Sequence, residues 1–488
     1  MSIEEGRRAV EGAFEAAWRW ADTSEKRSMF EFERGLWTLL LALGRALMAV
    51  FLARQVARPR AASYVRDGHR YVINGQRSTE IGTRFGKVSF TRPVGRPEGH
   101  AHGACDLPVD RELGLCAGFS LGVVLAVTRL CAQMAFLPAR ETFRQAHEWM
   151  PSPRAVLRMV DAVGDQARPF LEQAPAPDHD GEVLVIQVDG RGAPMISEAE
   201  YRRRRQRRRN ADGTRRHARR RRRRERPRKR RTKGKKSKNA KVAIVGVLYT
   251  LRRTPDGLEG PINKRLYGTF DSHEALFIWL RREADKRGYG RKQSLFLADG
   301  SDHIWRLQQR YFPDAEACLD WYHVIEKVWK AGECMYPEGS DELAAWVGEQ
   351  AKKLRRDASR AVIDELGRRF NAIPKTGPGN KGKRKRLLAI LKHFIEHQHR
   401  MKYRDLRRRD LDIGSGAVEG AVRNLVGIRF DGPGMRWSRG RSERLLHLRC
   451  ILLNGQWDDF AAHLAASMTV KLHAAPIPTR THDAKAAA

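Results

Sequence analysis

The sequence predicts a multidomain α/β protein, in which a mixed sheet carries an α-helical insertion and follows a helical region and a small β unit. Two apolar runs, 183–188 and 294–298, lead to the sheet, because nearly continuous apolar runs are typical of strands buried on both faces. Each run ends in Asp-Gly, at Asp189 and at Asp299. The length of 488 residues is enough for several units with sizeable cores.

Residues 1–60 are predicted to be helical. Apolar residues recur there at helical spacing, a pattern typical of an α-helical hairpin or bundle. The longest apolar stretch, 36–53, is interrupted by Arg45 and lies within a longer helical pattern. We therefore expect a buried helix there rather than a membrane span, and no membrane partner.

Residues 61–117 are predicted to form a small β unit. Short strand-like segments, such as 71–75 and 87–90, alternate there with glycine turns. Beyond them, helical periodicity returns. We therefore expect a β unit that separates two helical regions.

The helical region 118–170 is a candidate DNA-binding module. Its last helix should begin at Pro153 with Ser152 as N-cap. Two short helices joined by a tight turn suit a helix-turn-helix, with Arg154 and Arg158 on the candidate recognition helix. Helical hairpins also pack together without binding DNA, so both interpretations stay open.

A linker at 171–181 precedes residues 182–323, which are predicted to be the first part of a catalytic core. Alternating strand and helix patterns follow one another there. Their order is a strand at 183–188, a hairpin of 242–249 and 265–270, a helix with Asp271 as N-cap, a strand at 294–298, a helix at 304–311 and a strand at 315–319. This β-β-β-α-β-α-β order is that of an RNase H-like sheet.

The segment 202–238 interrupts the core with an extreme charge. It holds 24 Lys and Arg residues against two acids, so it supplies 22 of the 37 net positive charges of the chain. We expect it to be disordered when free, because it repels itself and lacks apolar residues. A DNA clamp, a nucleoid-binding tail and a solvated loop remain alternatives for its role.

Residues 324–412 are predicted to be an α-helical insertion, since they are basic and mostly helical in pattern. After them, Glu419 stands in the first turn of a predicted helix that follows Gly414-Ser415-Gly416. We assign 413–470 to the C-terminal helices of the core, and 471–488 to a disordered tail.

Asp189, Asp299 and Glu419 together suggest a metal site for phosphodiester chemistry. Carboxylates gathered at one edge of a sheet repel one another unless cations lie between them, and hard cations prefer oxygen ligands. Two such ions can hold the attacking and leaving oxygens of a phosphodiester. Asp-Gly after a strand is also an ordinary turn, so the hypothesis depends on the combination.

The formal net charge of +37 makes nucleic acid the leading partner, because a field of that sign concentrates polyanions. Six cysteines are scattered without a Cys-x-x-Cys pair, which argues against a disulfide framework and fits a reducing cytoplasm. No nucleotide-binding loop and no Ser/His/Asp signature is present.

The chain resembles bacterial insertion-sequence DDE transposases of the Kra type, relatives of Mutator-like enzymes that carry an all-helical insertion. The resemblance covers most of the chain and depends on short motifs in a fixed order. They are Val188-Asp189-Gly190 with Pro194-Met195, Ala298-Asp299-Gly300, Asp320-Trp321-Tyr322-His323, Gly414-Ser415-Gly416-Ala417-Val418-Glu419-Gly420, Met435-Arg436-Trp437 and Leu453-Asn454-Gly455-Gln456-Trp457.

The resemblance implies that the three acids bind Mg²⁺, with Mn²⁺ as an alternative, and that His323 acts near the scissile strand. A histidine that only begins a helix remains the alternative for His323. The resemblance also implies a bacterial, nucleoid-associated protein that forms a homo-oligomer on DNA. Arg436, Trp437 and Arg439 are candidates for holding the DNA backbone, or else belong to a solvated basic surface.

The sequence therefore predicts a transposase that cuts the ends of its element and joins them to target DNA. Two rivals remain. An RNase H-like nuclease or resolvase would use the same acids and stop at hydrolysis. A non-catalytic basic nucleic-acid-binding protein would use them only as turn residues.

Overall fold

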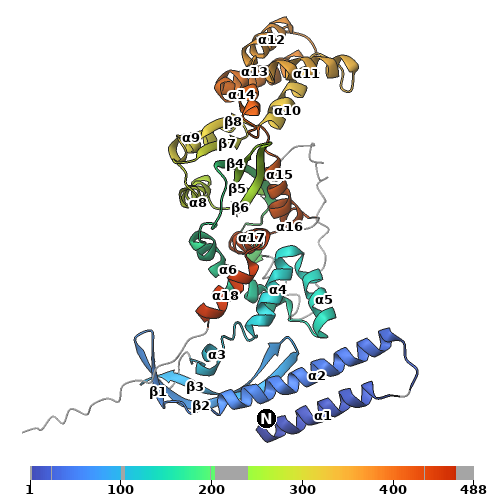
Figure 1. Ribbon diagram of the computed structural model, residues 1–488, viewed down its shortest axis with the longest axis vertical. Helices are drawn as coiled ribbons and strands as arrows, with labels where there is room; N and C mark the ends of the chain where they lie inside the picture. Colours follow the sequence, from blue (N-terminus) through green and yellow to red (C-terminus); the bar gives the residue numbers. More distant parts are fainter. Residues whose placement is uncertain are drawn as a thin grey trace, which may run out of the picture. The chain divides into compact units, whose positions relative to one another are not determined.

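The computed structural model describes residues 3–23, 25–99, 105–197, 199–203, 240–432 and 435–468. The chain divides into two compact units, one of Met1–Phe170 with Gln456–Ala488 and the other of Leu171–Gly455. Figure 1 shows the helices and strands of both. The architecture is multidomain α/β, with one antiparallel sheet, one mixed sheet and many helices, as expected.

The first unit opens with a helical hairpin of α1 (Ile3–Ala21) and α2 (Met29–Val56). The two helices approach closely, since Gly6 lies against Val50 and Gly35 lies against Trp20. Ser28 caps α2 in a capping box with Glu31. The hairpin predicted from the apolar periodicity is confirmed.

Helix α2 is less buried than expected. Only four of its residues, Leu41, Gly44, Ala49 and Leu52, are buried. Several large apolar side chains on it are exposed, namely Met29, Phe30, Trp37, Leu40, Leu47 and Phe51. The prediction of a buried helix is therefore wrong for one face of α2. The helix is long and apolar enough to cross a membrane by length and composition, a weak criterion that core helices of soluble proteins also satisfy.

The small β unit is a three-stranded antiparallel sheet in the order β1-β2-β3. Its strands are β1 (Ser63–Arg66), β2 (His69–Thr83) and β3 (Gly86–Pro97). Ile81, Val88 and Phe90 pack with Leu52 of α2 in one apolar cluster. The β unit thus buries part of α2.

Within its described residues, the first unit has five further helices. They are α3 (Pro108–Glu112), α4 (Leu121–Gln133), α5 (Phe136–His147), α6 (Pro153–Gln173), which runs on into the second unit, and α18 (Trp457–Met468). The predicted cap of α6 is confirmed, because the Ser152 hydroxyl accepts a hydrogen bond from the Ala155 amide at 3.2 Å. Helix α18, which we assigned to the core, instead packs here, where Phe170 and Phe460 meet edge to face.

The second unit is built on a five-stranded sheet in the order β6-β5-β4-β7-β8. Its strands are β4 (Val183–Pro194), β5 (Ala240–Thr254), β6 (Gly257–Thr269), β7 (Gln293–Ala298) and β8 (Glu316–Leu319). The first three strands pair antiparallel, whereas β7 and β8 join β4 in parallel. This mixed order is the RNase H-like arrangement expected from the sequence.

Helices cover both faces of this sheet (Figure 1). On one face lies α8 (His273–Lys286), whose Leu276 and Leu280 contact Gly246 of β5. Its N-cap is Ser272 rather than Asp271, because the Ser272 hydroxyl accepts the hydrogen bond from the Ala275 amide. α9 (Asp302–Tyr311) follows β7 and packs beside α8.

The other face is covered by helices that follow the insertion. They are α15 (Gly416–Val422), the π-helical segment η2 (Arg423–Gly427), α16 (Ile428–Phe430) and α17 (Arg439–Leu453). Gly268 of β6 faces Leu425 and Leu446 of this layer. The helix with the third acid therefore lies directly on the central strands.

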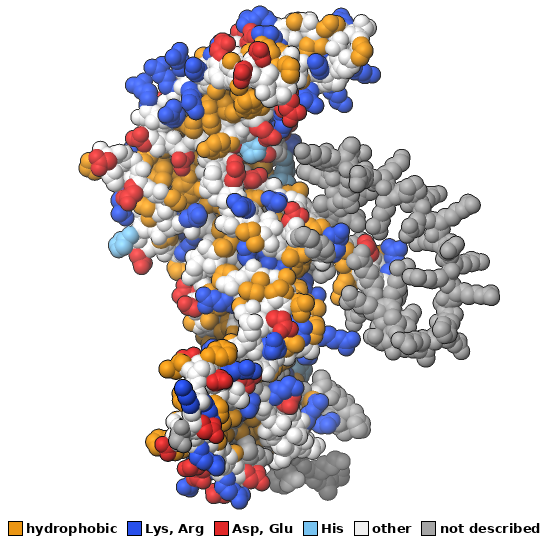
Figure 2. Space-filling view, turned by 90° about the vertical axis from the view of Figure 1, so that its right-hand side faces the viewer, with side chains coloured by type: hydrophobic (Ala, Val, Ile, Leu, Met, Phe, Trp, Pro, Cys, Tyr) orange, Lys and Arg blue, Asp and Glu red, His pale blue; other side chains and the backbone are white. Residues whose placement is uncertain are grey.

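The predicted insertion is entirely helical in the structure. It consists of α10 (Trp321–Gly332), α11 (Asp341–Leu354), α12 (Ser359–Ala372), α13 (Asn380–His397), η1 (Gln398–Arg400) and α14 (Tyr403–Arg408). It begins three residues earlier than predicted, since Asp320 caps α10. Figure 2 shows groups of Lys and Arg side chains on these helices at the top of the view.

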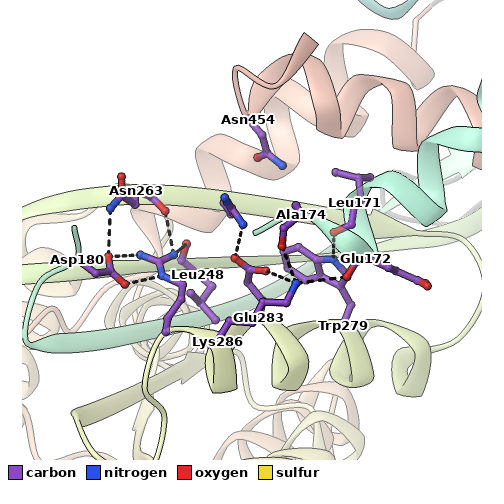
Figure 3. A network of polar contacts seen from close by, with 12 residues as sticks. Leu171, Glu172, Ala174, Asp180, Leu248, Asn263, Trp279, Glu283, Lys286 and Asn454 are labelled. Carbon is purple, nitrogen blue, oxygen red and sulfur yellow. Dashed lines mark hydrogen bonds and ion pairs between the residues drawn. The ribbon is translucent and has the colours of Figure 1, made fainter. Parts of the chain in front are cut away.

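A buried polar network closes the end of the sheet where β4 and β7 begin (Figure 3). Asp180 accepts hydrogen bonds from Arg287 and from Thr250 of β5. Nearby, Lys286 donates to the backbone oxygen of Ala174 at 2.7 Å, and the Trp279 indole donates to that of Leu171 at 3.3 Å. These contacts hold the segment before β4 against strand β5 and helix α8.

Candidate active site

The register of two parallel strands brings Asp189 and Asp299 together. Val188 of β4 pairs with Ala298 of β7, so the next residue of each chain is an aspartate. Neighbouring strands of a sheet are about 4.8 Å apart, so the two aspartates follow closely spaced residues. The backbone thus brings the two predicted acids to the same edge of the sheet.

Asp189 is only partly exposed and has other charges around it. Burial raises its pKa above the usual value, and the charges of Asp299 and Glu419 raise it further. A hydrogen bond from the Gly190 amide at 2.6 Å and the charge of His323 oppose this shift. Asp189 is therefore a carboxylate whose negative charge a cation would stabilise.

Glu419 is held in position through its helix. Strand side chains alternate between faces, so Gln187 lies on the same face of β4 as Asp189. Buried Gln187 accepts a hydrogen bond from the Val418 amide at 3.0 Å and donates one to the Gly414 oxygen at 3.4 Å. Ser415 donates to the Glu419 carboxylate at 2.6 Å. The start of α15 is thus tied to the strand that carries the first acid.

Asp320 fixes the same helix from the other side. It is fully buried at the end of β8, caps α10, and accepts a hydrogen bond from the Ser415 amide at 2.6 Å. Burial alone would raise its pKa, but the hydrogen bonds from His323 and Ser415 outweigh burial and hold the pKa below its usual value. Asp320 is therefore an ionised anchor between β8, α10 and α15.

His323 is a cation beside the acids. Its Nδ1 lies 2.6 Å from Asp320, which makes it the donor of that bond. This hydrogen bond, helped by the charges of Asp320, Asp299 and Asp189, raises the pKa of His323 to about 9 despite its partial burial. In the absence of a metal, His323 partly offsets the carboxylates.

The side chains are suited to a divalent metal. In the part of the chain that the structure describes, potential ligand atoms of Asp320, His323 and Glu419 all lie within 4.8 Å of one another. Asp189 and Asp299 adjoin this group, as their effects on the pKa of His323 show. Asp320 already accepts three hydrogen bonds, so Asp189, Asp299 and Glu419 are the carboxylates better placed to accept a cation.

The candidate DNA-binding residues differ in exposure. Arg154 and Arg158 are exposed on α6 of the first unit, and Arg436 and Arg439 are exposed at the start of α17 in the second. Trp437 is only 6% exposed, and its indole donates to the Phe430 oxygen at 3.0 Å. Stacking of Trp437 on a base is therefore not supported, because its ring is used in packing. Of the basic segment 202–238, positions from 204 onward lie outside the described residues.

Gln187 is the site residue that sequence reasoning missed. A single glutamine within an otherwise apolar buried strand, two positions before Asp189, was a usable signal. A buried amide needs partners for both its donor and its acceptor. Its partners are the Tyr249 hydroxyl, 62 positions away, and the backbone of Gly414 and Val418, more than 200 positions away, and no local pattern reveals them.

No protein-family model matches the chain, and no curated protein matches it. Among solved structures, the chain is similar to the Drosophila P element transposase strand transfer complex, with a TM-score of 0.30 and 10% sequence identity. The similarity covers 67% of this chain and 91% of that chain. A similarity this distant does not indicate a function for this chain. Its function is therefore inferred from the residues of the site.

Proposed function

We propose that this chain is a DDE transposase, which cuts the ends of an insertion sequence and joins them to target DNA in a metal-dependent reaction. The observation that supports this most directly is the parallel register of β4 and β7. It places Asp189 and Asp299 on neighbouring strands, next to the helix that carries Glu419. Three carboxylates from distant parts of the sequence thus meet at one edge of the sheet.

Asp189, Asp299 and Glu419 are the proposed ligands of Mg²⁺, with Mn²⁺ as an alternative. When bound, divalent ions supply stabilisation of the charge that develops on the attacking and leaving oxygens of a phosphodiester. The protein holds the ligands ready, because Gln187 and Asp320 fix α15 before any ion arrives. Preorganised ligands avoid the cost of rearrangement during the reaction.

His323 has a separate proposed role at the scissile strand. Its Nδ1 is engaged with Asp320, so Nε2 is the nitrogen that remains to donate to a phosphate oxygen. The raised pKa keeps the imidazole cationic at neutral pH, which strengthens such a hydrogen bond. Asp320 orients the ring in the same way that a carboxylate orients a catalytic histidine.

The proposed substrates are the element ends and target DNA. The net charge of +37 favours binding to phosphates in any sequence. Exposed Arg154 and Arg158 on α6 and exposed Arg436 and Arg439 at α17 are the proposed positioning contacts in the described units. Joining two ends requires both to be held together, so we also propose a homo-oligomer on DNA in the bacterial cytoplasm.

The test is Mg²⁺-dependent cleavage and joining of labelled DNA that carries the ends of the flanking element. Wild type is compared with Asp189→Ala, Asp299→Ala and Glu419→Ala. Loss of one ligand should remove several kcal/mol of transition-state stabilisation, so the rate should fall about 10³-fold or more. Asp364→Ala, which removes an exposed carboxylate of α12, is the matched control and should leave the rate unchanged.

Joining that disappears in the three variants, while DNA binding survives, would support the transposase. Cleavage without joining by the wild type would favour a nuclease or resolvase with the same acids. Binding without any metal-dependent chemistry, equal in all five proteins, would refute an enzymatic role and leave a basic DNA-binding protein.

A further inference from the structure

A groove with a basic lining lies between two helices of the insertion. It has a volume of about 400 Å³. Its lining comes from α10 and the residue after it, and from α13: Lys327, Lys330, Glu333, Arg386, Ala389 and Ile390. Three of these six residues are cationic and only one is anionic, so the groove favours an anionic ligand.

Lys327 relates the groove to the acid cluster. On α10, His323, Lys327 and Lys330 are spaced by four and three residues, so they share one face of the helix. Lys327 adjoins Asp299, whose charge counteracts the burial that lowers the pKa of Lys327. One face of α10 thus carries positive charge from the candidate active site into the groove.

Helix α13 runs antiparallel along the other side. Arg386, Ile390 and His393 are spaced by four and three residues, so they also share a face. At one end Arg386 lies 3.4 Å from Glu333. At the other end the His393 ring packs so closely on Gly300 that a Cβ there would lie 1.7 Å from its Cε1. Helix α13 therefore connects the groove with the loop that follows Asp299.

The charges in the groove are not fully paired by protein groups. Lys330 pairs with Glu326, and Arg386 makes only a long contact with Glu333. Among the residues that the structure describes, half-buried Lys327 forms no ion pair. The charges of Asp299 and Glu326 offset its burial without forming an ion pair, so a phosphate in direct contact would stabilise the ammonium group further.

We infer that this groove between α10 and α13 binds the sugar–phosphate backbone of the single DNA strand next to the scissile phosphate. The inference rests on the proposed function, because it takes the acid cluster as the place where DNA is cut. Ala389 and Ile390 give the groove an apolar part that suits the sugars, and none of the described residues that line it is aromatic and able to stack on a base. Binding there is therefore independent of sequence.

The test compares two double variants of the full chain. Lys330→Gln with Arg386→Gln neutralises the two exposed cations of the groove, and Lys352→Gln with Arg356→Gln neutralises two exposed cations of the same insertion that do not line it. Affinity is measured in EDTA across salt concentrations. The probes are a blunt duplex and a forked duplex with a single-stranded DNA arm at the cleavage position.

The groove variant should bind the forked probe about tenfold more weakly than wild type at 0.15 M salt, with its salt slope reduced by about 1.4, or about 0.7 for each lost phosphate contact. Its affinity for the blunt duplex should change no more than that of the control variant. Equal losses on both probes, or no loss on the forked probe, would overturn the inference.

Because EDTA prevents metal-dependent chemistry, this result is independent of catalysis. If the groove variant loses affinity only for the forked probe but the wild type never cuts DNA, the proposed function is contradicted and the groove remains a strand-binding surface. If the wild type cuts and joins DNA but the groove variant shows no such loss, only the inferred role of the groove is contradicted.

Discussion

The two ends of the central sheet treat partly buried carboxylates in opposite ways. Where β4 and β7 begin, Asp180 is bound by Arg287, whose Nη2 and Nε lie 2.6 and 2.7 Å from its oxygens (Figure 3). Where β7 ends, Asp189 adjoins Asp299 and Glu419, and within the described residues no Lys or Arg pairs with it. The same sheet thus has one end with compensated charge and one end with excess negative charge.

The pKa values of the two aspartates express this difference. Burial alone would raise both. At Asp180, hydrogen bonds from Arg287 and Thr250 outweigh burial and hold the pKa below its usual value. At Asp189, neighbouring carboxylates add to burial, and the pKa is raised.

The contrast separates a structural carboxylate from a candidate functional one. A buried charge that the chain itself pairs contributes to a single stable arrangement. A carboxylate cluster short of positive charge is destabilising until an external cation binds, which is the usual state of a metal site without its ion. The three predictions that follow test this contrast.

The largest expected effect concerns the compensated end. Arg287 is fully buried and Asp180 is only 10% exposed, so Arg287→Ala leaves a buried carboxylate without its partner. The free energy of unfolding should fall by about 3–5 kcal/mol. Urea denaturation measures this loss. Arg291→Ala removes an exposed neighbouring cation and should change stability by less than about 0.5 kcal/mol. Equal effects of the two variants would contradict the structural role.

An intermediate effect is expected beside the acid cluster. In Gly300→Ala the added Cβ would lie 1.7 Å from the His393 ring, so the ring, the loop that follows Asp299, or both must shift. Overpacking of this kind costs about 1–3 kcal/mol. The cleavage rate should fall by a larger factor than the loss of unfolding free energy alone explains, because Asp299 is displaced when the loop shifts. Adding His393→Ala should restore part of both.

The control for that prediction is Gly348→Ala on α11, where a Cβ meets nothing within 4 Å. A glycine in a helix interior is less favourable than alanine by about 0.5–1 kcal/mol, so this variant should be slightly more stable. Both variants are compared by calorimetry and by their cleavage rates. If Gly300→Ala behaves like Gly348→Ala in both measurements, His393 does not constrain the loop.

The smallest effect is a pH dependence from His323. Its pKa rises on folding, so the stabilisation is fully present below its unfolded value of about 6.5. It is lost as the pH rises through about 9. In metal-free protein, the melting temperature should therefore decline between pH 6.5 and 9 in a way that His323→Gln reduces. The exposed His179→Gln should keep the full decline. The effect is modest because the His323 side chain is 34% exposed.

Much of the core could be predicted from local sequence. Apolar runs ending in Asp-Gly located β4 and β7, and the glycine-framed segment before Glu419 located α15. The periods of strands and helices are local properties, so single-sequence reasoning can detect them. The alternation of strands and helices along the chain then left only a few possible strand orders for the sheet.

The remaining features depend on contacts between distant residues. The partners of Gln187, the burial of Trp437 and the exposed face of α2 all follow from what packs against them. An apolar helix looks the same in sequence whether it is buried or exposed. The shift of a helix cap from Asp271 to Ser272 reflects a different limit, since two adjacent residues can both serve as caps.

The distance along the chain between the parts of the site has a consequence for synthesis. Gln187 and Val418, whose hydrogen bond holds α15 against β4, are 231 positions apart. At a translation rate of about 5–20 residues per second, roughly 10–45 s pass between the appearance of the two. The basic segment 202–238 is made early in that interval. The nascent chain therefore acquires its attraction for polyanions well before its carboxylate cluster is complete, and a chain that stops short of residue 418 retains the first property without the second.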